Sequence, residues 1–256
     1  MRVLSVARDL RRRHARERQK LFVAEGVRAV DELLRSTLTI RGALLAASTT
    51  DDRARALAST IQSRGIPLQE VTDTEFASAA DTESPQGILA IGTVPSRELS
   101  TLAAPIPLRL IVLDALQDPG NAGTILRTAA ALGAAATIAL PGTVDLWNAK
   151  VVRSSMGAHF QHPAIACTWE VLTSFLAERD IQLWGADAAG EPLTKALGDR
   201  GRGPDRIAIA VGNEGAGLST QTRDRADRLV AIEIAPEVES LNVAVATGIM
   251  LYQLRP

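Results

Sequence analysis

The sequence predicts an α/β protein made of two parts, each with strands that alternate with helices. With 256 residues, 46% of them hydrophobic, the chain is long enough to form two domains with substantial cores. Short apolar runs rich in Val, Ile and Leu alternate with segments of helical spacing along most of its length. This alternation favours a mainly parallel sheet with helices on both faces. A proline-bracketed stretch at residues 95–107 separates the two parts.

The first part is expected to be a small α/β unit in residues 1–96. Within residues 24–36, the side chains of Val27, Val30, Leu33 and Leu34 fall on one face of a helix. The remaining elements follow from apolar runs and from helix start and stop signals such as Gly65. We expect strands at 40–46, 67–71 and 88–93, and helices at 50–64 and 73–80.

Residues 97–107 are expected to form a linker, since Pro105 and Pro107 close a polar, alanine-rich stretch without a strong period. A second alternation begins after it and predicts a domain over residues 108–256. We expect its strands at 110–113, 136–140, 181–186, 207–211 and 229–234, and its helices at 122–132, 148–156, 169–178 and 242–254.

The net charge of −1 hides a strong asymmetry. Residues 1–20 hold eight basic and two acidic residues and carry a charge of +6, so the remaining 236 residues carry −7. An arginine-rich arm on an acidic body favours a polyanionic partner such as nucleic acid. A solvated amphipathic helix explains the same composition equally well.

Composition argues against several classes of protein. The single cysteine, Cys167, excludes a disulfide framework within the chain, and with only three histidines we expect no metal site. The apolar runs are too short to cross a bilayer, so we expect no membrane partner. The first twenty residues lack the apolar core of a secretory signal, and we therefore expect a cytoplasmic protein.

The first segment with chemical potential runs from a strand end at Leu113 to Arg127. Asn121 stands where a helix N-cap is expected, and Gly123 permits close approach of a ligand or another backbone. An amide and a guanidinium thereby follow the carboxyl end of a strand, where α/β sheets bind ligands. A capped helix with a surface arginine fits the same residues.

The second segment is a glycine-rich loop at residues 212–217 that follows an apolar strand. The order of Gly212, Gly215 and Gly217 matches neither a Walker A loop nor the dinucleotide-binding fingerprint. The loop also contains Glu214, which would repel phosphates. A carboxylate here is suited to accepting hydrogen bonds from ribose hydroxyls, or to orienting an amide or a guanidinium.

The third segment leads from a strand at residues 229–234 through an acidic turn to Ser240, Leu241 and Asn242. One polar residue suffices to cap the following helix, so two exceed what capping requires. That helix is apolar on most sides and is expected to be buried in the core or against a partner subunit.

Together, the three segments resemble the signature motifs of the SpoU (TrmH-type) RNA 2′-O-methyltransferases of the SPOUT superfamily. The resemblance extends to the start of the chain. Residues 22–26 and 85–88 are similar to the two ends of the small substrate-binding domain that precedes many such enzymes and resembles ribosomal RNA-binding proteins. The matching motifs are Asp118-Pro-Gly-Asn121-Ala-Gly123 through Arg127, Gly212-Asn-Glu214-Gly, and Glu239-Ser240-Leu241-Asn242-Val.

The resemblance implies a catalytic domain whose C-terminal part forms a deep trefoil knot that binds S-adenosyl-L-methionine, largely through backbone groups. This chain has Glu233 where the family often has proline, and Pro236 where glycine is common. The cofactor-binding positions implied here are Gly212, Ile232, Ile234 and Leu241. The implied functional residues are Asn121, Arg127, Glu214, Ser240 and Asn242.

The implied reaction moves a methyl group to a ribose 2′-hydroxyl, in 23S ribosomal RNA because of the N-terminal domain, without a metal. A guanidinium stays protonated, so we expect Arg127 to clamp an RNA phosphate and to stabilise alkoxide charge rather than act as a base. The resemblance also implies a homodimer with the last helix in its interface. Expected RNA contacts are Arg8, Arg11, Arg12, Arg13, Arg16, Arg18 and Glu25, in addition to Arg127.

Three alternatives remain open. The enzyme could act on transfer RNA, or the chain could be a non-catalytic RNA-binding or ribosome-assembly factor that kept the fold. The intact Arg127, Glu214, Ser240 and Asn242 argue against the second of these. A nucleotide-dependent oxidoreductase would also place a glycine loop after a strand, but the glycine order argues against it.

Overall fold

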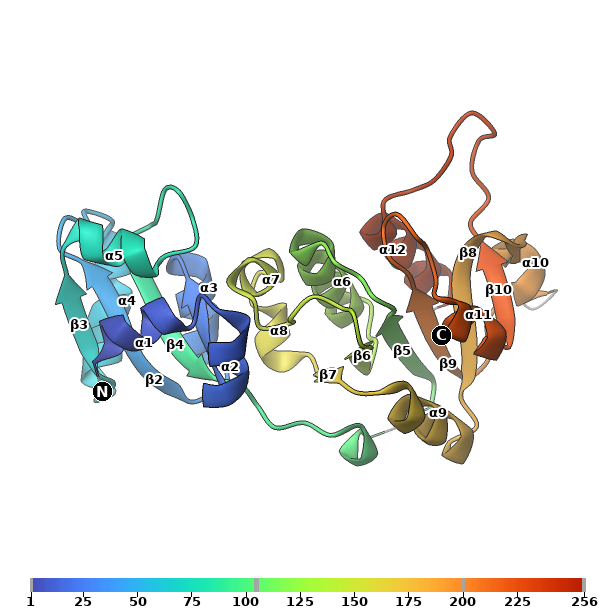
Figure 1. Cartoon of the computed structure of the whole chain (residues 1–256), viewed down its shortest axis with the longest axis horizontal. Coiled ribbons are helices and arrows are strands. Elements are labelled where there is room, and N and C mark those ends of the chain that lie inside the picture. The colour runs from blue at the N-terminus through green and yellow to red at the C-terminus, as the bar shows by residue number, and fades with distance from the viewer. Residues whose placement is uncertain (1, 104–105, 199–200, 255–256) are drawn as a thin grey trace. The chain divides into compact units, whose positions relative to one another are not determined.

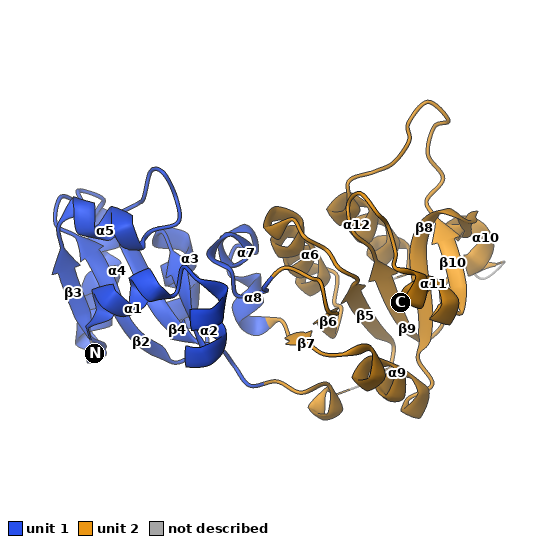
Figure 2. Ribbon diagram, in the orientation of Figure 1, with its two compact units in different colours: residues 1–96, 145–161 blue, residues 97–144, 162–256 orange. Residues whose placement is uncertain are grey.

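The computed structural model describes residues 2–103, 106–198 and 201–254, and its contacts divide the chain into two compact units (Figures 1 and 2). Unit 1 comprises residues 1–96 and 145–161, and unit 2 comprises residues 97–144 and 162–256. The α/β class predicted from the sequence is confirmed. Each unit has its own sheet, and the larger one, in unit 2, is parallel throughout.

Unit 1 is built on a four-stranded sheet of order β1-β4-β2-β3, in which only β2 and β3 run parallel. Two of its helices, at residues 52–63 (α4) and 73–79 (α5), start at residues with the expected capping chemistry. Asp51 accepts hydrogen bonds from the first turn of α4, and Thr72 and Glu75 form a capping box on α5. The strands are β1 (Leu21–Glu25), β2 (Ile40–Ala46), β3 (Leu68–Val71) and β4 (Ile88–Thr93). The helices are α1 (Val3–Asp9), α2 (Arg13–Gln19), α3 (Val27–Arg35), α4 (Asp52–Ser63), α5 (Asp73–Ala79), α7 (Ala149–Ser154) and α8 (Ala158–Gln161).

The helix predicted for residues 24–36 begins later than expected, at Val27. Ala24 and Glu25 instead belong to β1 and pair with Ala90 and Leu89 of β4. Gly26 then turns the chain at a φ of 94°, a backbone conformation that residues other than glycine rarely adopt. Pairing with a strand more than 60 residues away thus overrides the local helical period.

The basic segment at residues 1–20 is folded into unit 1 as α1 and α2. Val3, Leu4, Ala7 and Leu10 are buried in a core cluster that also contains Phe76 and neighbouring strand residues. Deleting this segment would therefore remove part of the core of unit 1, so its charges have to be tested by substitution.

Residues 145–161 belong to unit 1, although the residues before and after them in the chain belong to unit 2. Aromatic contacts attach them to β1. The Phe22 ring lies 4.5 Å from that of Trp147 and 5.7 Å from that of Phe160, between centroids. Trp147 also contacts the ring of the buried His159 at 3.9 Å. This apolar cluster explains why the segment packs with unit 1.

Unit 2 is a six-stranded parallel sheet of order β10-β8-β9-β5-β6-β7. The central strands β5 and β9 consist almost entirely of buried residues, as expected for a sheet covered on both faces. The strands are β5 (Leu108–Leu113), β6 (Ala136–Ala139), β7 (Ala164–Ala166), β8 (Gln182–Pro192), β9 (Arg206–Val211) and β10 (Arg228–Ala231). The helices are the 3-10 helix η1 (Leu99–Thr101), α6 (Pro119–Ala131), α9 (Trp169–Glu178), α10 (Leu193–Leu197), α11 (Thr220–Arg225) and α12 (Val243–Gln253).

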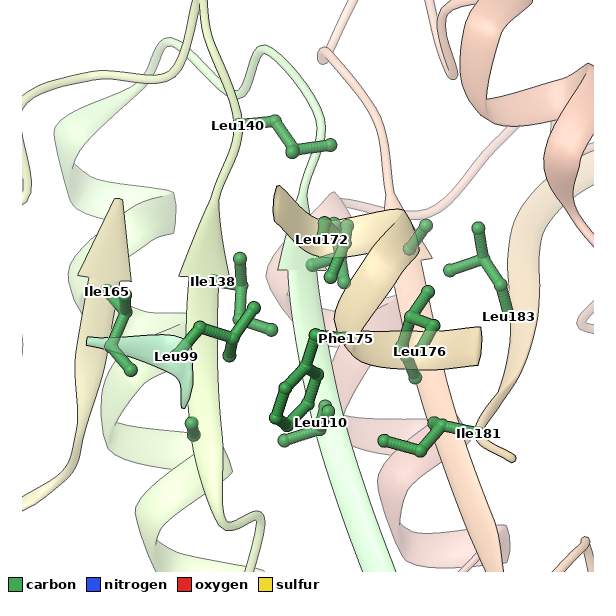
Figure 3. Close-up of a cluster of buried hydrophobic side chains, with 14 of the residues drawn as sticks. Leu99, Leu110, Ile138, Leu140, Ile165, Leu172, Phe175, Leu176, Ile181 and Leu183 are labelled. Atoms are coloured by element: carbon green, nitrogen blue, oxygen red, sulfur yellow. The ribbon is translucent and has the colours of Figure 1, made fainter. Parts of the chain in front are cut away.

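One core cluster of unit 2 lies between α9 and the sheet. Figure 3 shows Leu172 and Phe175 of α9 among the side chains of Leu110 and Ile138 from the neighbouring strands β5 and β6. Leu99 of η1 joins the same cluster, so part of the expected linker packs on this core. No helix among the described residues has both the length and the apolar character needed to cross a membrane.

Candidate active site

The predicted functional segments meet at the carboxyl edge of the unit 2 sheet. β5 and β9 are adjacent and parallel, and their last residues, Leu113 and Val211, pair with each other. The loops that follow, at residues 114–118 and 212–219, therefore leave the sheet side by side. Ligands of parallel α/β sheets bind at this edge.

Side chains from all three motifs form one chain of hydrogen bonds. Asn242 donates from its Nδ2 to Oδ1 of Asn121 at 3.0 Å. Asn121 in turn donates from its own Nδ2 to Oε1 of Glu214 at 3.1 Å. The amide of Asn121 is thus fixed at both ends, by residues 93 and 121 positions away in the chain.

The carboxylate of Glu214 also accepts hydrogen bonds from the backbone of the first motif. The donors are the N–H groups of Gln117 at 3.3 Å and Asp118 at 3.0 Å. Partial burial acts to raise the pKa of Glu214, but the hydrogen bonds from Asn121 and from the backbone outweigh it and hold this pKa below its usual value. Glu214 is consequently ionised at neutral pH and acts as a hydrogen-bond acceptor.

Asn121 does not cap α6, although its place in the sequence fits a cap. The N-cap is Asp118, whose Oδ1 accepts from the backbone N–H of Asn121 at 2.7 Å, and Pro119 occupies the first turn. The side chain of Asn121 does not bond to the helix backbone and is free to form the hydrogen bonds with Glu214 and Asn242. Asn242, in contrast, does cap α12 through its Oδ1 while its Nδ2 serves the network.

Arg127 projects from α6, two turns after Asn121, and its side chain is exposed. It makes no hydrogen bond or ion pair with any residue that the structure describes. Ser240 is likewise exposed, and among the described residues it forms no hydrogen bond with Asn121, Glu214 or Asn242. Both side chains are therefore available to a ligand.

The loop after β9 folds back on itself, which requires glycine at position 212. A Cβ on Gly212 would lie 2.2 Å from the carbonyl carbon of Gly217. Asn213 and Gly217 exchange two backbone hydrogen bonds of 2.9 Å, and Oδ1 of Asn213 accepts from the N–H groups of Gly215 and Ala216. The result is a compact turn without bulky side chains at the end of the strand.

The other predicted cofactor positions lie between β10 and α12, where Figure 1 shows a long loop extending from the sheet. Ile232 and Leu241 are half-buried, and Ile234 is exposed. The backbone groups of Ile232 and Leu241 form no hydrogen bond with the described part of the chain. Open backbone donors and acceptors beside a glycine turn fit a cofactor that is held through main-chain contacts.

The predicted RNA contacts in unit 1 divide into exposed and buried groups. Arg16 is only 6% exposed, forms an ion pair with Asp145 at 2.6 Å, and donates to the carbonyls of Leu10 and Arg11. Glu25 is also buried, and its carboxylate accepts hydrogen bonds from residues 81 and 82. Both side chains therefore have structural partners within unit 1, and their burial leaves little of them accessible to RNA. The exposed arginines are Arg8, Arg11, Arg12, Arg13 and Arg18.

Two further residues join the loops of the site and were not identified from the sequence. Asp114, directly after β5, is buried and accepts hydrogen bonds from the start of α11. Asn213 donates from its Nδ2 to the carbonyl of Ala115 at 3.1 Å. A carboxylate at the end of an apolar strand was the signal available for Asp114.

The cysteine and the histidines do not form a reactive site. Burial raises the pKa of Cys167 to about 11, so its thiol stays protonated. Burial, together with the charge of Arg97, lowers the pKa of His162 to about 4, and its ring contacts Thr137. Within the described residues, no group of three or more His, Cys, Asp or Glu side chains could hold a metal ion.

Comparison with known proteins gives matches over nearly the whole chain. A model of the SpoU rRNA Methylase family matches residues 109–252, and a model of the MRM3-like substrate binding domain matches residues 5–90. The 23S rRNA (guanosine(2553)-2′-O)-methyltransferase RlmP of Bacillus subtilis is 31% identical over 97% of this chain and 94% of its own. The 23S rRNA (guanosine-2′-O-)-methyltransferase RlmB of Haemophilus ducreyi is 33% identical over 80% of this chain and 84% of its own.

Solved structures agree with these matches. The SpoU methyltransferase AviRb from Streptomyces viridochromogenes, in complex with AdoMet, aligns with a TM-score of 0.86 and 27% identity over 99% of this chain and 96% of its own. An AdoMet-bound rRNA methyltransferase from Sinorhizobium meliloti aligns with a TM-score of 0.83 and 27% identity, over 98% and 93% of the two chains. The motifs, the hydrogen-bonded site and these likenesses together show that the chain belongs to the SpoU rRNA methylase family.

Proposed function

We propose that this protein transfers the methyl group of S-adenosyl-L-methionine to a ribose 2′-hydroxyl of 23S ribosomal RNA. The observation that carries the proposal is the hydrogen-bonded chain Asn242–Asn121–Glu214, assembled from all three motifs. The substrate class is supported by the two 23S rRNA 2′-O-methyltransferases that this chain resembles over most of its length.

The proposed site binds its cofactor mainly through the backbone of Gly212, Ile232 and Leu241, with Ile234 nearby. When bound, S-adenosylmethionine supplies a methyl group activated by a sulfonium. The backbone of the loop from β10 to α12 is open for this contact, and the turn at Gly212 keeps side chains out of the way. We further propose that residues 108–256 form the deep trefoil knot of the superfamily.

The side chains of the site would orient the ribose. Asn121, Ser240 and Asn242 offer amide and hydroxyl groups to it, while Glu214 fixes the amide of Asn121. Arg127 would grip an RNA phosphate and stabilise charge as the hydroxyl becomes an alkoxide. Holding the hydroxyl in line with the methyl group would supply much of the rate.

Residues 1–96 would select the RNA, residues 97–107 would connect the domains, and residues 108–256 would carry the reaction. We also propose a homodimer that acts in the cytoplasm, where ribosomal RNA is matured. The proposed dimer uses the outer face of α12, on which Val245 and Tyr252 are both 52% exposed. Ile249, between them on the helix, is half-buried and completes an apolar stripe.

The direct test is methyl transfer from tritiated S-adenosylmethionine to unmodified 16S, 23S and transfer RNA. Label in 23S RNA that resists alkaline hydrolysis supports the proposal, because a 2′-O-methyl group blocks cleavage of the adjacent phosphodiester. The same alkali-resistant label in transfer RNA would show that the substrate is transfer RNA rather than 23S RNA. Absence of both label and cofactor binding would favour a non-catalytic RNA-binding or ribosome-assembly factor.

The exposed arginines of unit 1 are expected to provide salt-sensitive affinity for RNA. The triple variant carries Arg11→Gln, Arg12→Gln and Arg13→Gln. The slope of log affinity against log salt concentration should become shallower by about two units, because each lost phosphate contact lowers the slope by about 0.7 to 0.9. The affinity for S-adenosylmethionine should be unchanged. Fluorescence anisotropy with labelled 23S fragments at several salt concentrations measures the slope.

A matched control neutralises three exposed arginines elsewhere in unit 1, Arg35, Arg53 and Arg55, with the same change in net charge. Its salt slope should stay close to that of the unmodified protein. If the control and the triple variant lose the same slope, RNA binding reflects overall charge rather than α1 and α2.

The outer face of α12 is expected to hold the dimer together. Val245→Glu should convert a dimer into a monomer at micromolar concentration, since it places a charge within an apolar interface. Multi-angle light scattering gives the mass directly. Val171→Glu on α9, where the native side chain is 49% exposed, is the control and should stay dimeric. An unmodified protein that is monomeric at this concentration would contradict the proposed dimer.

A further inference from the structure

Asp114 is a buried carboxylate at the edge of the candidate site, and it is not among the functional residues implied by the resemblance. Its side chain follows β5 directly and is 3% exposed. Its Oδ2 accepts hydrogen bonds from the backbone N–H of Ser219, at 2.7 Å, and from Oγ1 of Thr222. Both donors stand at the start of α11, just beyond the glycine loop.

The hydroxyl of Thr222 is positioned to donate a hydrogen bond to this carboxylate. Thr222 is fully buried, and a carboxylate can only accept, so Oγ1 of Thr222 must donate its proton to Asp114. The hydroxyl of Ser219 then donates to Oγ1 of Thr222 across 3.0 Å, while its own oxygen accepts from the N–H of Thr222. Every proton in this small group has a defined direction.

Side chains at three places form hydrogen bonds between the loops after β5 and β9, and Asp114 provides the third of these connections. The first is the hydrogen bond from Asn213 to the carbonyl of Ala115, and the second is the carboxylate of Glu214 on the backbone of residues 117 and 118. The third, from Asp114 to Ser219 and Thr222, holds the far end of the glycine loop. Each loop thus contributes one carboxylate that accepts hydrogen bonds from the other loop or from the helix that follows it.

We infer that Asp114 and Thr222 are positioning residues that hold the loop at residues 212–219 in the form that binds S-adenosylmethionine. This inference rests on the proposed function, since Gly212 belongs to the proposed cofactor site. Asp114 and Thr222 touch neither cofactor nor RNA and act through the loop. Their loss lets the far end of the loop move, so the binding form becomes a fraction of the population and the apparent affinity falls by that fraction.

The test compares Thr222→Val, which removes the hydroxyl and keeps the shape, with Thr222→Ser, which keeps the hydroxyl. Thr222→Val and Asp114→Asn should weaken S-adenosylmethionine binding about tenfold or more, as expected for lost hydrogen bonds to a charged group. Thr222→Ser should stay within about threefold of the unmodified protein. Isothermal titration calorimetry with the full chain measures the affinity without turnover.

A second readout separates positioning from general stability. Hydrogen exchange of the amides at residues 212–219 should quicken in Asp114→Asn and Thr222→Val, while the rest of the sheet stays protected. In turnover, KM for S-adenosylmethionine should rise more than kcat falls. The control is Asp227→Asn, whose carboxylate accepts from the N–H of Leu183 at 2.7 Å, before β10 at the amino edge of the sheet. It should leave affinity and loop exchange unchanged.

The outcomes distinguish this inference from the proposed function. Unchanged affinity in Asp114→Asn and Thr222→Val, in a protein that binds S-adenosylmethionine, overturns the inference alone. Equal losses in Thr222→Ser and Thr222→Val, or in Asp227→Asn and Asp114→Asn, overturn it as well. If the unmodified protein binds no S-adenosylmethionine, the proposed function fails, and the inference fails with it. If Asp114→Asn does not fold, the comparison of Thr222→Val with Thr222→Ser still tests the inference.

Discussion

The substitution Arg127→Lys is expected to lower turnover about 100-fold, the scale seen when one preorganised donor to developing charge is lost. Lysine keeps the positive charge but replaces a planar fork of donors by a single ammonium group, so a two-point grip on phosphate is lost. Because Arg127 is exposed and has no described hydrogen-bond or ion-pair partner, the fold should be unaffected. The melting temperature and the affinity for S-adenosylmethionine should stay unchanged.

Single-turnover methyl transfer at saturating RNA isolates this effect from binding. Arg202→Lys is a matched control in unit 2, since the side chain of Arg202 is half exposed and forms an ion pair with the exposed Asp205 at 2.7 Å. It should keep normal turnover. If Arg127→Lys also kept near-normal turnover, a point charge would suffice and the role of the guanidinium fork would be wrong.

The arrangement of the three motifs could be predicted because it follows from the sheet. Residues after the carboxyl ends of adjacent parallel strands must leave the same edge, which brings Asn121 and Glu214 together across 93 positions of sequence. The identity of the cap on α6 could not be predicted in this way. Asp118 and Asn121 both carry suitable oxygen atoms, and only the distance in the structure shows that Asp118 is the cap.

The unit to which a segment belongs was harder to predict than its secondary structure. A helix was expected at residues 148–156, and α7 covers most of it, but chain order gave no sign that it packs against β1 of unit 1. The buried Arg16 and Glu25 could not be identified for a related reason. Charged side chains are normally exposed, and their burial depends on partners distant in sequence, Asp145 for Arg16 and residues 81 and 82 for Glu25.

The burial of Arg16 leads to the largest expected effect on stability. Arg16→Ala should lower the free energy of unfolding by about 3 kcal/mol, because removing one partner of a buried ion pair leaves the other charge uncompensated. The side chain of Asp145 is only 14% exposed, and the carbonyls of Leu10 and Arg11 would also lose their donor. Urea denaturation followed by tryptophan fluorescence measures the change, since Trp147 lies in the same unit.

The control for this effect lies in the same helix. Arg13 pairs with Glu17 at 2.7 Å on the exposed side of α2, and Arg13→Ala should cost less than about 1 kcal/mol. If Arg16→Ala cost no more than Arg13→Ala, the ion pair with Asp145 would not contribute to stability in solution. The double variant Arg16→Met with Asp145→Leu should recover most of the loss, since it removes both charges together. Any loss of RNA affinity in Arg16→Ala would then follow from unfolding, which is why a test of RNA contacts must leave Arg16 intact.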